Sequence, residues 1–97
     1  MMMAPYTKPS ELILAEGFEE AFIGVGVRPG QPNVPVYSLS VAVDILCDQG
    51  MDRDDARHVI YDRVRSIDFG DRTPMWVEEM TVEELRHLVD GASAWVH

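Results

Sequence analysis

The chain has little of what marks several large protein classes. Among its 97 residues there is one cysteine, Cys47, so no disulfide can form within the chain. No apolar run approaches the roughly 20 residues that a membrane-spanning helix needs. The opening Met1, Met2 and Met3 lack the basic and apolar regions of a signal peptide. We therefore expect a protein of the reducing cytoplasm that does not associate with membranes.

Positive charge is also scarce. Lysine and arginine together number 8 against 17 aspartates and glutamates, which gives a net charge of −9. Because such a chain repels phosphate backbones, we expect no direct nucleic-acid binding, and the charge instead favours a partner with a basic surface. Hydrophobic residues make up 46% of the sequence, too many for a disordered chain. The length suits one domain over residues 1–97, with residues 1–9 flexible.

Two sequence patterns approach known ligand-binding loops and then depart from them. Gly24 and Gly26 resemble the start of a dinucleotide-binding fingerprint, but the third glycine is absent and no helix is expected to begin there. Asp52 and Asp54 resemble the start of a calcium loop, but Arg57 occupies the position that needs glycine. Neither pattern predicts a bound cofactor or metal ion.

Catalytic side chains do not occur at useful spacings either. His58 and His87 lie on different expected helices and lack the spacing of paired metal ligands. No pattern places either histidine beside a nucleophile such as Ser38, Ser40 or Cys47. We expect Cys47 to be a core thiol, since it adjoins the apolar face of an expected helix. The sequence thus predicts a protein that is not an enzyme.

The longest apolar run, AFIGVGVR at residues 21–28, is the expected central strand. Alternation along a strand places its branched side chains on one face: Ile23, Val25 and Val27. The other face is bare at Gly24 and Gly26, and we interpret it as the place where a helix over 81–96 approaches the strand closely.

Three helices have clear start signals. Ser38 caps a helix that runs to Gln49 before Gly50, and Asp52 caps the next one. Thr81 and Glu84 form a capping box that begins a last helix. A shorter helix is expected over residues 10–16.

The remaining segments complete the expected fold. Residues 29–35, rich in proline, predict an exposed loop. Residues 75–78 predict a second strand that pairs with the central one. The expected class is α+β, with a small two-stranded or three-stranded antiparallel sheet packed against a central α-hairpin, and with short N-terminal and C-terminal helices.

The order of these features resembles a widespread group of small uncharacterised proteins encoded by bacteriophages and prophages. The resemblance covers about residues 11–80 and depends on four stretches, which are Phe22-Ile23-Gly24-Val25-Gly26, Val36-Tyr37, Gly50-Met51 with Ala56, and Thr73-Pro74-Met75-Trp76-Val77. The chain departs from that pattern in its proline-rich loop and its last helix. The resemblance implies a phage or prophage setting and transfers no catalytic residue.

Two acidic clusters are the candidate partner-binding residues: Glu16, Glu19 and Glu20, and Glu78, Glu79, Glu83 and Glu84. The leading hypothesis is a phage-encoded protein that binds and inhibits or modulates a host protein through this acidic surface, for example a counter-defence inhibitor of the anti-CRISPR type. The alternative is a structural or assembly protein that self-associates, as a homodimer for instance, through an apolar surface with Trp76, Trp95 and the exposed sheet edge.

Overall fold

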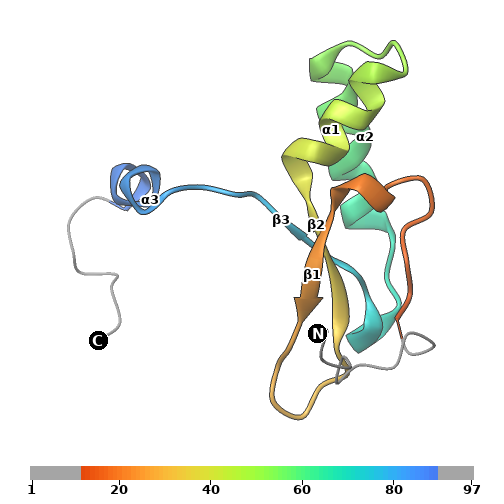
Figure 1. The fold of residues 1–97 in the computed structure, drawn as a ribbon, viewed down its shortest axis with the longest axis vertical. Coiled ribbons are helices and arrows are strands. Elements are labelled where there is room, and N and C mark those ends of the chain that lie inside the picture. Colours follow the sequence, from red (N-terminus) through yellow and green to blue (C-terminus); the bar gives the residue numbers. More distant parts are fainter. Residues whose placement is uncertain (1–11, 90–97) are drawn as a thin grey trace, which may run out of the picture.

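The computed structural model describes residues 12–89 and contains a three-stranded mixed sheet with three α-helices (Figure 1). The strands are β1 (Phe22–Gly26), β2 (Val34–Ser38) and β3 (Met75–Val77), in the order β1-β2-β3. The α+β class and the third strand are confirmed. The expectation of a wholly antiparallel sheet is wrong, because β2 pairs antiparallel with β1 but parallel with β3. A parallel pair needs a long crossover, and the two central helices provide it.

The central strand is β2. Its residues Val34 and Tyr37 are almost fully buried, at 1% and 2% exposure, whereas Ile23 in β1 is 50% exposed. The expectation that residues 21–28 form the central strand is therefore wrong, as is the pairing of β3 with it, since both outer strands pair with β2. Residues 34–38 were hidden from the sequence pattern because Pro35, which lacks an N–H, lies within the strand.

The glycines of β1 have another explanation than a closely packed helix. The pairing register shifts between Phe22 and Gly24, so Ile23 forms a β-bulge, and Gly24 adopts φ of +158°, which residues with a side chain rarely adopt. A Cβ at Gly26 would lie 3.1 Å from the Val36 side chain on the neighbouring strand. The bulge and the adjacent strand, and not a helix, thus account for the two glycines.

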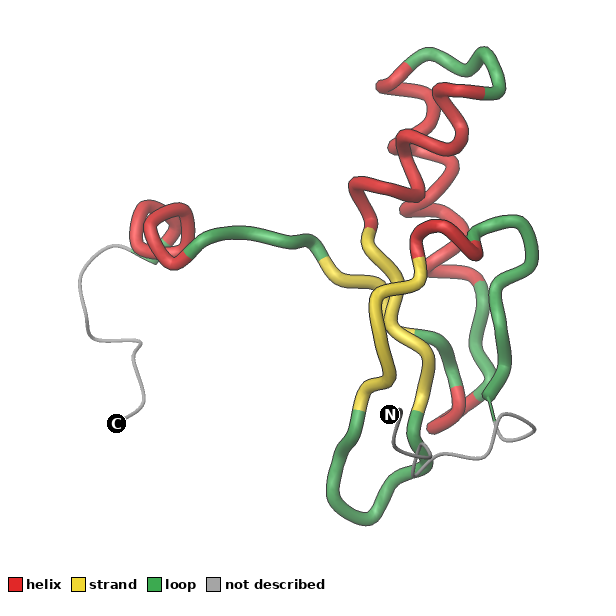
Figure 2. Tube along the Cα trace, viewed as in Figure 1, coloured by secondary structure: helices red, strands yellow, loops and turns green. Residues whose placement is uncertain are grey.

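The central α-hairpin is confirmed, with α1 (Leu39–Asp48) and α2 (Arg53–Ser66). Each helix begins at the expected cap, because the Ser38 hydroxyl accepts the N–H of the third helical residue and the Asp52 carboxylate accepts that of the second. Gly50 follows α1 with a φ of 99°, as a helix-terminating glycine does. Figure 2 shows the two helices side by side beyond one end of the sheet.

The core begins with a row of aromatic rings across the three strands. Tyr37 stacks on Trp76, with ring centroids 4.9 Å apart, and meets Phe22 edge to face at 5.9 Å. Phe18 packs edge to face on Trp76, and the Arg63 guanidinium lies over the Phe18 ring. The hairpin supplies most of the other buried residues of this core, namely Ala42, Val43, Leu46, Ala56 and Ile60.

The expected terminal helices are realised only in part. Residues 12–15 are irregular, so this part of the expected helix over 10–16 is wrong, and residues 10 and 11 lie outside the described residues. Two short 3-10 turns are present instead, η2 (Glu19–Ala21) and η3 (Gly70–Arg72). The last helix, α3 (Val82–Leu88), begins at the expected cap, and the rest of the expected 81–96 helix past Val89 lies outside the described part of the chain.

Candidate protein-interaction arm

Residues 78–88 form an arm that leaves the body of the protein after β3. Figure 1 shows an extended segment that carries α3 well away from the sheet and the α-hairpin. No residue of α3 is buried, and Val82 and Leu88 are 55% and 70% exposed. Large apolar side chains are thus held in solvent on a projecting element.

The root of the arm is fastened to the body through Ser38. This side chain is fully buried, and its hydroxyl donates a hydrogen bond to the Glu79 carboxylate. Since a serine hydroxyl has one hydrogen, Ser38 Oγ accepts both the Val41 N–H, at 3.2 Å, and the hydroxyl of Ser40, at 3.1 Å. One side chain thus links the end of β2, the start of α1 and the root of the arm.

The start of α3 is set by its own capping box. The Thr81 hydroxyl accepts the Glu84 N–H at 3.1 Å, and the Glu84 carboxylate accepts the Thr81 N–H at 3.2 Å. Acidic residues in the first turn and basic residues in the last, Arg86 and His87, complement the helix dipole. These contacts are local, however, and an isolated helix shorter than about 12 residues is marginal in water. The arm's helix therefore gains from packing against something else.

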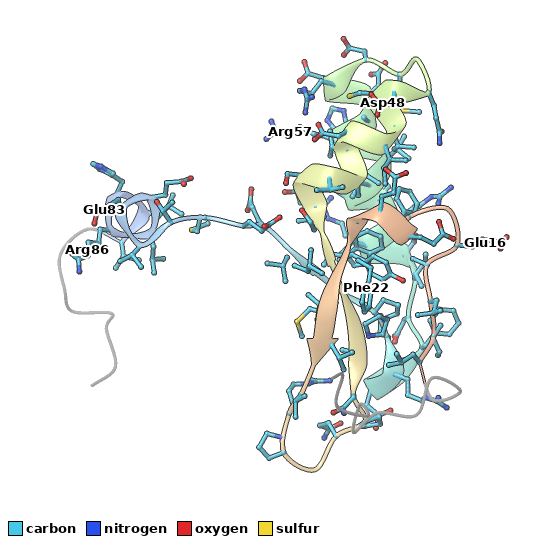
Figure 3. All side chains as sticks on the ribbon, viewed as in Figure 1. Glu16, Phe22, Asp48, Arg57, Glu83 and Arg86 are labelled. Carbon is cyan, nitrogen blue, oxygen red and sulfur yellow. The ribbon has the colours of Figure 1, made fainter. Side chains whose placement is uncertain are left out.

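Three of the four acidic residues predicted on the arm share one depression. It has a volume of about 400 Å³ and is lined by Glu78, Glu79, Met80, Glu84, His87 and Leu88. Glu83 does not line it, and its side chain is exposed on α3 (Figure 3). This surface combines carboxylates with exposed apolar side chains, as a docking helix does.

The other predicted cluster lies elsewhere. In Figure 3, Glu16 and Glu83 lie on opposite sides of the molecule, so the structure does not unite the seven predicted residues in one surface. Glu19 and Glu20 line a depression of about 290 Å³ with Asp48, which sequence reasoning missed because it lies at the far end of α1. The sequence around Asp48 does not indicate that it lies near Glu19 and Glu20, because only the tertiary fold brings η2 to that end of α1.

The Glu19 carboxylate accepts hydrogen bonds from the backbone. Hydrogen bonds from its own backbone N–H and from the Gly17 N–H, the latter at 3.2 Å, hold the pKa of Glu19 below its ordinary value. These hydrogen bonds stabilise the charged form of Glu19. Glu16 and Glu20 on either side are exposed.

A third depression, of about 200 Å³, lies beside the root of the arm, between α1 and α2. Two guanidiniums and two carboxylates line it, so it carries no strong preference for either charge: Arg53 and Arg57, with Glu78 and Glu79. Arg53 also forms an exposed ion pair with Asp44 at 3.0 Å, and this hydrogen bond raises the pKa of Arg53.

The side chains considered for catalysis are placed as follows. Cys47 is half-buried against the core, as expected, and the Ser38 hydroxyl is engaged at the root of the arm. Over residues 12–89, no three His, Cys, Asp or Glu side chains are grouped so that they could hold a metal ion. None of the helices in that range is long and apolar enough to cross a membrane.

Of the two tryptophans predicted to take part in self-association, the described residues include Trp76. Trp76 is half-buried and holds its place in the core through its contacts with Tyr37 and Phe18. Trp95 lies outside the described residues.

None of the known protein families, curated proteins or solved structures compared with this chain matches it.

Proposed function

We propose that the protein is a non-enzymatic binding protein that inhibits or modulates a partner protein by docking α3 of its arm into an apolar groove with a basic rim. The observation that carries this proposal is the exposure of the apolar residues on a helix held away from the body. An amphipathic helix laid into a hydrophobic groove is a recurring mode of protein recognition.

The pattern of α3 suits this mode. Val82, Leu85 and Leu88 recur every three residues and so lie along one side of the helix. Around them, the arm carries the carboxylates of the second predicted cluster, which favour a basic rim on the partner. Apolar contact would supply affinity and the carboxylates would supply orientation and a faster approach.

The setting that we propose is the cytoplasm of a bacterium that carries a phage or prophage. Its support is the resemblance of Phe22–Gly26 and Thr73–Val77 to the phage-encoded group described above. In that setting the partner is a host protein, and a counter-defence inhibitor of the anti-CRISPR type is one such function. Stoichiometric inhibition by contact requires no catalytic residue.

Affinity purification with matched variants tests the role of the arm. The full chain would serve as bait in the source bacterium, followed by quantitative mass spectrometry. Leu85→Asp places a charge in the apolar stripe of α3, whereas Leu14→Asp places the same charge at a residue of the body that is 63% exposed. We expect one protein to be enriched by the wild type and by Leu14→Asp, and lost with Leu85→Asp.

Charge reversal tests the electrostatic part separately. Glu78→Arg combined with Glu83→Arg reverses two exposed charges of the arm without touching the Ser38 contact or the capping box. Asp62→Arg, at an exposed site on α2, is the control. Partner recovery that falls with the arm variant alone supports the proposal. If Leu85→Asp and the arm variant both recover the same partners as the wild type, the arm is not the binding element.

A further inference from the structure

We draw no further inference here: the strongest candidate, the depression between α1, α2 and the root of the arm, carries none, because the two guanidiniums and two carboxylates that line it are all exposed and nothing in the structure shows what occupies it.

Discussion

Replacing Ser38 by alanine tests how the arm is joined to the body. The substitution removes the N-cap of α1, because the Val41 N–H loses its acceptor, and it removes the donor to the Glu79 carboxylate. Loss of a serine N-cap costs about 1 kcal/mol. A hydrogen bond to a charged group contributes about 1.5–3 kcal/mol when buried, but Glu79 is exposed and water replaces most of the lost contact, so about 0.5–1 kcal/mol remains. The expected loss of stability is about 1.5–2 kcal/mol.

Urea unfolding, followed by circular dichroism and by tryptophan fluorescence, measures this loss. For a domain of this size it corresponds to a fall in Tm of about 6–16 °C. Ser40→Ala is the matched control, since Ser40 is exposed and its hydroxyl only adds a hydrogen bond to the Ser38 hydroxyl. This substitution should lower the free energy of unfolding by less than about 0.5 kcal/mol.

A double-mutant cycle isolates the contact with the arm. Glu79→Gln alone should cost about 0.5–1 kcal/mol, and in the Ser38→Ala background its effect should shrink, because the two changes remove the same hydrogen bond. If Ser38→Ala unfolds with the wild-type midpoint, or if the two changes are fully additive, Ser38 does not fasten the arm in the way described.

Three further predictions concern β1, the core and η2. Gly24→Val should destabilise the fold by about 1–3 kcal/mol because of the backbone conformation at φ of +158°, and an unchanged urea midpoint would contradict the assigned bulge. Tyr37→Phe should cost about 1 kcal/mol, since the Ala15 N–H loses its acceptor at 2.8 Å, while the near-ultraviolet circular dichroism of the stacked rings is retained. An NMR titration should find the pKa of Glu19 below the ordinary glutamate value, so its contribution to stability is present above that ordinary value and is lost as the pH falls through the lowered one. A pKa at or above the ordinary value would contradict the hydrogen bonds from the N–H groups of Glu19 and Gly17.

The helices could be predicted from the sequence because their signals are local. Each helix is capped by a side chain that contacts a backbone N–H no more than three residues away, as at Ser38, Asp52 and the pair Thr81–Glu84. Both partners of each capping hydrogen bond are therefore neighbours in the sequence. The residues of α1 and α2 that pack together, among them Ala42, Leu46 and Ile60, likewise recur at helical spacing. Prediction succeeded where the partner of each residue lies one helical turn away.

The sheet could not be predicted in the same way, because strand order depends on contacts between distant segments. Residues 21–28 have the strongest strand pattern yet form the edge, whereas residues 34–38 include Pro35 and form the centre. What decides the order is Tyr37, whose ring packs between Phe22 and Trp76 from the two flanking strands. No local property of residues 34–38 reveals those two neighbours.

For the candidate site, the sequence predicted the acidic residues but not the position of α3 away from the sheet. Glu78, Glu79 and Glu84 do come together, but two of them have structural roles, at the contact with Ser38 and in the capping box. The sequence predicted a helix beginning at Thr81 but expected it to pack on β1, and nothing in its spacing indicates that α3 stands away from the sheet.

Amide hydrogen exchange of α3 tests the central claim, that the arm is the binding element, most directly. The measurement compares the full chain alone with the full chain saturated by the partner that affinity purification identifies. The account predicts that the amides of residues 82–88 exchange rapidly in the free chain and become protected in the complex, while those of α2 change little. Protection that appears on α2 or β2 while residues 82–88 keep exchanging rapidly would contradict it.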